Sequence, residues 1–197
     1  MAKKVSRLIE ENRRYLSMQL PIEESFDVLQ RDIEIGGRAS SFYFIDGFMK
    51  DEAMVKIMAS FFAVTEKNMP DSARAFSEKV VSYVEVDIIN DFDDIIRNIL
   101  SGVTCLFIDG YEECIAIDTR TYPARGVDEP DKDKSLRGSR DGFVETIVFN
   151  TALMRRRIRD PHLVMKMLEV GKSSRSDVVV SYMEDRVDQE LLKNLLN

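Results

Sequence analysis

Hydrophobic and polar positions follow two different periods along the chain, and the changes of period mark the expected elements. Two-residue alternation across residues 25–45, around the turn signal Gly36-Gly37, predicts a β-hairpin with the apolar second strand SFYFI. Apolar residues three and four positions apart predict an amphipathic helix over residues 51–65. A further helix is expected to begin at Pro70-Asp71. The first part of the chain therefore mixes strands and helices.

The middle of the chain continues the mixed pattern. Residues 91–100 are predicted to form a helix with acidic residues in its first turn, where the helix dipole favours them, and Gly102 closes it. Residues 104–108 and 114–117 are apolar and flank Asp109-Gly110-Tyr111, which predicts a second hairpin.

One long loop interrupts this order. Residues 121–140 contain two prolines and two glycines in a strongly charged stretch, so we expect a subdomain boundary there. The resulting prediction is an α/β fold of two small mixed α/β subdomains joined by a hinge or linker. The expected parts are an N-terminal helical arm at 1–21, a first subdomain at 22–125 and a second at 126–197.

The second subdomain is expected to open with a helix capped by Asp141 that runs to Ile158. Asp160-Pro161 then predicts a second helix to Val170. An apolar strand at 177–183 and a helix at 188–196 complete the chain. The order of strand, acidic turn and helix in 178–196 echoes that of 42–58. Chance similarity of short units explains this echo equally well.

Composition narrows the class of protein. With 44% hydrophobic and 32% charged residues the chain is expected to be globular, and two cysteines are too few for a disulfide scaffold. The net charge of −7 argues against nucleic acid as a partner of the whole chain. The longest stretch without a charged residue is too short to span a membrane, and no secretory signal is visible.

Charge is distributed unevenly: residues 131–175 carry +5 and the remainder −12. Such a distribution is informative about the binding partners of a protein and not about its fold. Either the two faces are simply solvated, or acidic and basic segments meet within one chain or between copies. The candidate acidic interface residues are Glu85, Asp87, Asp91, Asp93 and Asp94, and the candidate basic ones are Arg155, Arg156, Arg157 and Arg159.

Groups that carry chemistry are sparse. His162 is the single histidine and has no second ligand at a suitable spacing, so we expect an exposed residue and no metal site. Asp46 and Asp109, each in an FIDG sequence, are expected to accept hydrogen bonds from nearby amides, with paired acid–base work as the alternative. We predict no catalytic residues, no cofactor and no enzymatic activity.

The segment LRGSRDGFVET at 136–146 is a candidate anion site. Free amides before a helix, guanidinium groups and close backbone approach at glycine suit a phosphate or a carboxylate. A loop whose arginines form salt bridges is the alternative. The candidate residues are Arg137, Gly138, Ser139, Arg140 and Gly142.

Beyond this site, the sequence resembles the GerA family of bacterial spore germination proteins over about 50 residues. The resemblance lies in RGSRDGFVET, in NTALMRRRI with Asn150, Leu153, Arg155 and Arg157, and in the strand that begins Ser176-Asp177-Val178. Upstream segments and Ser139 favour the stage V sporulation AF branch, with the germinant receptor A subunits as the alternative.

The resemblance implies a setting that composition does not show. It implies the N-terminal soluble domain of a membrane protein, with membrane segments beyond residue 197, in the spore inner membrane and on the core side. The implied partners are other copies and other spore membrane germination proteins. Two functions follow as hypotheses: assembly and gating of an ion-release channel, or, as the alternative, binding of a small molecule or anion between the subdomains.

Overall fold

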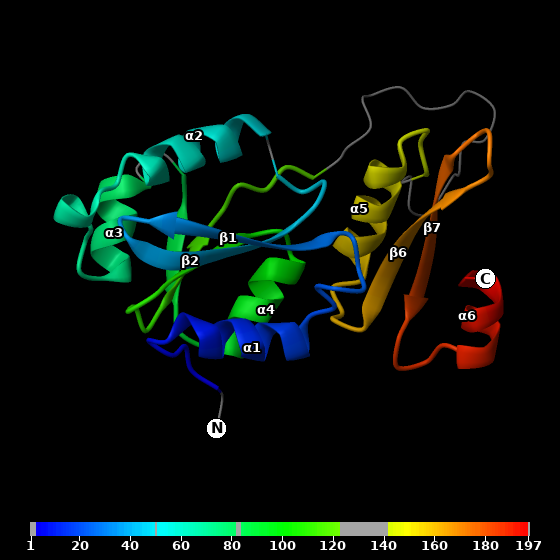
Figure 1. Cartoon of the computed structure of the whole chain (residues 1–197), viewed down its shortest axis with the longest axis horizontal. Helices are drawn as coiled ribbons and strands as arrows, with labels where there is room; N and C mark the ends of the chain where they lie inside the picture. Colours follow the sequence, from blue (N-terminus) through cyan, green and yellow to red (C-terminus); the bar gives the residue numbers. More distant parts are fainter. Residues whose placement is uncertain (1–2, 50, 82–83, 123–141, 197) are drawn as a thin grey trace, which may run out of the picture.

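The computed structural model describes residues 3–49, 51–81, 84–122 and 142–196 (Figure 1). Within these residues the chain forms six α-helices, one short 3₁₀ helix and seven strands. The helices are α1 (Ile9–Gln19), α2 (Asp51–Phe62), η1 (Glu66–Asn68), α3 (Ala73–Val80), α4 (Phe92–Leu100), α5 (Ile147–Arg157) and α6 (Gln189–Leu196). The strands are β1 (Val28–Ile35), β2 (Arg38–Ile45), β3 (Val86–Ile89), β4 (Thr104–Ile108), β5 (Cys114–Ile117), β6 (Leu163–Val170) and β7 (Ser176–Met183). The predicted mixed α/β class is confirmed.

Five strands form one antiparallel sheet in the order β1-β2-β4-β5-β3. The β1–β2 hairpin turns through Gly36 and Gly37, whose φ angles of 55° and 76° are those that a two-residue hairpin turn needs. β2 and β4 occupy the interior of the sheet and are buried on both faces, which explains the apolar runs FYFI in β2 and CLFI in β4.

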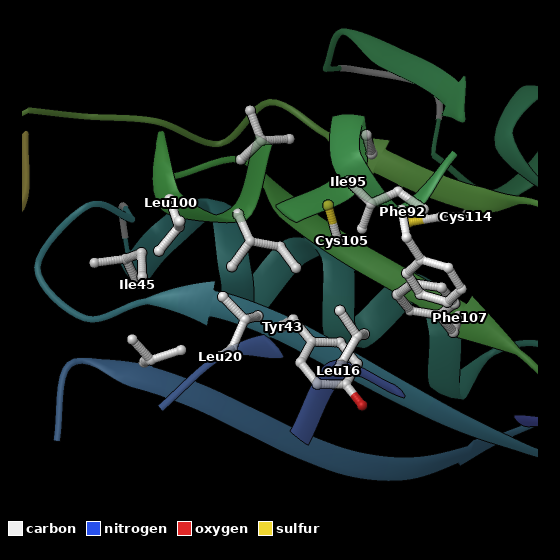
Figure 2. Close-up of a cluster of buried hydrophobic side chains, with 14 of the residues drawn as sticks. Leu16, Leu20, Tyr43, Ile45, Phe92, Ile95, Leu100, Cys105, Phe107 and Cys114 are labelled. Carbon is white, nitrogen blue, oxygen red and sulfur yellow. The ribbon is translucent and has the colours of Figure 1, made fainter. Parts of the chain in front are cut away.

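Helices cover both faces of this sheet. On one face α1 and α4 pack against alternate strand residues in a core that includes Leu16, Tyr43, Phe92 and Phe107 (Figure 2). On the other face α2 and α3 pack against the intervening residues in a second core. The two-residue period of the strands thus divides their side chains between two cores.

The N-terminal segment, which includes helix α1, contributes to the first core. Val5, Ile9, Leu16 and Leu20 are all buried there. The Lys4 ammonium also lies 3.3 Å from the carboxylate of Asp91, the N-cap residue of α4. We call α1 through β5 the first unit.

A smaller second unit follows, made of α5, the β6–β7 hairpin and α6. Here the prediction of a second helix is wrong, because residues 163–170 form strand β6 and pair with all eight residues of β7. The Asp160 carboxylate accepts the His162 N–H at 2.9 Å and makes a turn instead of a helix start. Pairing with a neighbouring strand decided the conformation of an apolar segment that fits either element.

The helix predicted from Asp141 also begins later, at Ile147, and Asp141 lies outside the described residues. The expected subdomain boundary inside 121–140 lies largely outside them as well. None of the helices in the described ranges combines the length and hydrophobicity that crossing a bilayer requires.

Candidate functional site: the junction of the two units

A buried ion pair joins the second unit to the first. Arg155, in the last turn of α5, has a fully buried side chain, and so does Asp27, which immediately precedes β1. The Arg155 Nε–H donates to Asp27 Oδ2 at 2.7 Å and an Nη2–H donates to Asp27 Oδ1 at 3.1 Å. Two parallel hydrogen bonds fix the guanidinium in the plane of the carboxylate.

The guanidinium also donates to two backbone carbonyls at the start of β6. Nη1 donates to the Asp160 carbonyl at 3.1 Å and Nη2 to the Leu163 carbonyl at 2.8 Å. Arg155 therefore touches the first unit, the turn before β6 and β6 itself. Such multiple bonding is what a buried charge requires, because an unpaired one is strongly disfavoured.

Ser25 extends the network. Its hydroxyl donates to Asp27 Oδ1 at 2.5 Å and accepts the Met165 N–H at 2.9 Å. The Phe26 N–H donates to the Met165 carbonyl at 3.0 Å. These two bonds to Met165 seat β6 beside residues 25–26, so the two units are connected by a main-chain hydrogen bond and a side-chain hydrogen bond as well as by charge.

Apolar contacts complete the junction, which we define as Ser25–Asp27, Gly47, Phe48, Tyr122 and the buried side of α5. Ala152 of α5 is 1% exposed and belongs to the same core as Phe48. Gly47 has a φ of 78°, and a Cβ there would lie 3.2 Å from Ala152 Cβ. Glycine therefore provides both the turn and the close approach of α5.

Tyr122 links this region to the exposed arginines. Its ring meets that of Phe48 edge-on at 5.3 Å, and its hydroxyl donates to the Ser101 carbonyl at 3.0 Å. The Arg156 guanidinium lies over the outer face of the ring, 4.6 Å from its centroid. A cation–π contact thus orients an exposed basic side chain at the edge of the junction.

The segment after β5 that leads to Tyr122 contains an acid with a shifted pKa, Asp118. The Arg120 guanidinium donates to the Asp118 carboxylate and lowers the pKa of Asp118, while Asp118 raises the pKa of Arg120. A carboxylate whose pKa is lowered on folding stabilises the folded state above its unfolded pKa, and that contribution disappears as the pH falls.

We accordingly predict that Asp118→Asn makes the free energy of unfolding less dependent on pH below about pH 4. The effect is expected to be under about 1 kcal/mol, because the pair is partly solvated. Urea denaturation between pH 5 and pH 2 measures it, with Asp87→Asn, an exposed acid on β3, as the control. Equal pH slopes for wild type and Asp118→Asn contradict the assignment.

The predicted basic candidates divide into two groups. The prediction of an interface role for Arg155 is corrected, since its buried bonds to Asp27 leave it unavailable to an external partner. Arg156, Arg157 and Arg159 remain exposed on the same end of α5, where the Arg159 Nε–H donates to the Arg156 carbonyl at 3.3 Å. Gly142 is half-buried ahead of α5. The other anion candidates, Arg137, Gly138, Ser139 and Arg140, lie outside the described residues.

The acidic candidates divide in the same way. Asp91 caps α4 by accepting the Asp93 N–H and pairs with Lys4, and these hydrogen bonds lower its pKa against the opposing effect of desolvation. Asp94 pairs with Arg97 at 2.9 Å on the same helix. The exposed acids are Glu85, Asp87 and Asp93.

Other candidate groups have structural surroundings. Asp46 accepts the Gly47 N–H, and Asp109 accepts the Ile9 N–H at 3.0 Å and so caps α1. Cys105 and Cys114 are free and buried, and burial raises the pKa of Cys114. The described ranges contain no cluster of three or more potential metal ligands.

Asp27 and Ser25 were not identified from the sequence. An acid just before a predicted strand is a common turn residue, and its partner lies 128 positions away. A weak signal was available in the acid's position: a carboxylate that borders an apolar strand must either reach solvent or find a buried partner.

The fold and the junction together define a class: a mixed α/β protein whose larger and smaller sheets are fastened by a buried arginine–aspartate pair. Comparison with known proteins then identifies the family. The chain belongs to the Bacillus/Clostridium GerA spore germination protein family, whose model matches residues 16–197.

Two relatives show the range of similarity. The chain is 34% identical over 183 residues to stage V sporulation protein AF of Bacillus subtilis (strain 168), covering 92% of this chain and 37% of that protein. It is 33% identical over 108 residues to spore germination protein B1 of the same organism, covering 55% of this chain and 22% of that protein. The chain thus spans well under half the length of these curated relatives.

A solved structure shows the same fold. The N-terminal domain of the A subunit of the Bacillus megaterium spore germinant receptor GerK3 aligns with a TM-score of 0.74 at 20% identity. The alignment covers 100% of this chain and 72% of that chain. The relatives' names are those of sporulation and germination proteins, in agreement with the resemblance in the sequence.

Proposed function

We propose that these residues are the N-terminal domain of a longer protein of the spore inner membrane, on the core side, and that they act in assembly and gating of an ion-release channel during germination. The domain is not an enzyme in this proposal. Its partners are other copies of itself and other spore membrane germination proteins, and the membrane is reached through segments beyond residue 197. Membership of the germination family supports this proposal.

The observation that carries the proposal is the placement of the arginines at the end of α5. Arg155 points inward to Asp27, whereas Arg156, Arg157 and Arg159 are exposed within four residues of it. A force applied by a partner to the exposed arginines is therefore transmitted directly to the bonds that join the two sheets. This arrangement suits a domain that couples protein contact to a change of shape.

The exposed acids of the first unit offer the complementary surface. Glu85 lies just before β3, Asp87 lies on β3 and Asp93 lies on α4. Opposite charges on two copies favour correct register and partner choice more than they add affinity. We expect the basic end of α5 of one copy to face this acidic surface on a neighbouring protein.

Charge reversal tests the proposal. We predict that Arg156→Glu, Arg157→Glu and Arg159→Glu together weaken association of the full-length protein about 10-fold or more and slow germination. Cross-linking in spore membranes measures association, and loss of optical density after a germinant pulse measures germination. The buried Arg155 is left unchanged so that the fold is retained.

The matched control replaces the same three arginines by lysine, which keeps the charge. The lysine variant is expected to assemble and germinate nearly as the wild type does. Normal assembly and germination in the glutamate variant, at normal protein levels, contradict the proposal.

A further inference from the structure

The second unit repeats the first half of the first unit, element by element. Helices α1 and α5 both have 11 residues, and strands β1, β2, β6 and β7 all have eight. Three pairs of corresponding elements start 138 positions apart: Ile9 and Ile147, Arg38 and Ser176, Asp51 and Gln189. The order α1-β1-β2-α2 is thus reproduced as α5-β6-β7-α6 (Figure 1).

A polar side-chain motif recurs at the same spacing. The Asn12 carboxamide accepts the Ser6 N–H at 2.8 Å and donates to the Ser6 carbonyl at 2.7 Å. The Asn150 carboxamide accepts the Val144 N–H and donates to the Val144 carbonyl, both at 2.7 Å. Each asparagine fixes the chain that enters its helix. Agreement in side-chain bonding as well as in element length makes chance an inadequate explanation of the repeat.

The two copies differ in what lies beside their second strand. In the first unit the outer edge of β2 pairs with β4, as in the bond from the Asp109 N–H to the Ala39 carbonyl. In β7 the corresponding residues are Asp177, Val179 and Ser181. The Glu184 N–H donates to the His162 carbonyl, which makes these two residues a hydrogen-bonded pair at the end of the β6–β7 ladder. Because hydrogen-bonded and non-hydrogen-bonded pairs alternate along an antiparallel ladder, the backbone groups of Asp177, Val179 and Ser181 point away from β6. They have no hydrogen-bond partner among residues 142–196 or the rest of the described chain.

Burial shows the same difference. Ser40 of β2 is 0% exposed, whereas its counterpart Val178 of β7 is 39% exposed. Ile57 of α2 is 1% exposed and packs on the sheet that β4 completes, whereas its counterpart Leu195 of α6 is 59% exposed. An unpaired strand edge and an apolar helix face are therefore open in the second unit at the places where the first unit has β4 and β5.

We propose that the outer edge of β7 is a docking edge for an antiparallel strand, the counterpart of β4, so that the second unit becomes a second sheet of the same order as the first. A two-stranded sheet is marginal by itself, and a strand edge of this length is normally paired or protected. The free edge of β1 in the first sheet has Asp32 and Glu34 at its outward positions and is protected by charge.

The strand comes from the polypeptide beyond residue 197 in the longer protein, so the inference rests on the proposed function. The B. subtilis relative and the receptor domain are both longer than the matched region, since the chain covers 37% of the first and 72% of the second. The first unit itself places β4 after α2 in sequence, which is where such a segment follows α6.

Hydrogen exchange tests the edge. In the 197-residue chain the amides of Asp177, Val179 and Ser181 are expected to exchange rapidly. In the longer protein they are expected to exchange about 100-fold more slowly. The amides of Val178 and Val180, which face β6, serve as protected references in both proteins. Rapid exchange of the three edge amides in the longer protein overturns the proposal. Protection that rises with concentration in the 197-residue chain also overturns it, because it indicates that a second copy occupies the edge.

A proline pair gives an independent readout. Val179→Pro removes one outward N–H and is expected to destabilise the longer protein more than the 197-residue chain. Glu34→Pro places proline at an outward position of β1 and is expected to affect both proteins equally. Equal effects of Val179→Pro on both lengths count against the docked strand. The two proposals can fail separately. If the edge amides are protected in the longer protein but that protein is absent from the spore membrane, the proposed function is refuted and the docked strand is still supported.

Discussion

Replacing Arg155 by alanine is expected to lower the free energy of unfolding by about 3–5 kcal/mol, because it leaves the Asp27 carboxylate buried and unpaired. The Asp27 side chain is only 2% exposed, so water cannot replace the lost bonds without opening the junction. The backbone carbonyls of Asp160 and Leu163 lose their guanidinium donors as well. Denaturant titration followed by circular dichroism measures the change.

Two further variants separate charge from packing at this position. Asp27→Asn combined with Arg155→Met removes both charges, and we expect it to recover a large part of the lost stability because no isolated charge remains. Arg156→Ala is the matched control on the same turn, with an expected cost below about 1 kcal/mol for the exposed cation–π contact. A loss below 1 kcal/mol for Arg155→Ala contradicts the burial of this pair.

The second large effect is expected at Phe107, in the centre of the first sheet. Phe107→Ala should cost about 3–5 kcal/mol, through the lost transfer free energy and the cavity that remains. The ring is 1% exposed, stacks on Phe92 at 6.1 Å between centroids and meets Tyr43 edge-on at 5.6 Å (Figure 2). Because β4 is buried on both faces, its neighbours have little freedom to close the cavity.

Phe62→Ala is the control, since it makes the same chemical change on α2 at a ring that is 63% exposed. We expect the free energy of unfolding of this variant to lie within about 0.5 kcal/mol of that of the wild type. Thermal and urea unfolding of the two variants give the comparison. Similar losses at both positions are incompatible with the core described here.

Much of the fold was predictable from the sequence because the signals concerned are local. Gly36-Gly37 supplies the positive φ angles of a hairpin turn, and Asp91 precedes α4 with a side chain that reaches the next amides. Asp46 follows an apolar strand and accepts the N–H of the next residue, as expected of a turn residue. For these residues the partner group or the backbone angle is determined within a few positions of the chain. Asp109 differs, because the amide that it accepts belongs to Ile9, 100 positions away.

The sequence alone also determined the family, through the spacing of Gly138, Arg140, Asn150 and Arg155, and the mixed α/β class, through its alternating periods. Only the tertiary structure decided that residues 163–170 form a strand, because their apolar pattern fits either element until β7 lies beside them. It also decided which of four clustered arginines is buried. That choice depends on Asp27, 128 positions away, and a buried charge is stable only where folding brings its partner to it.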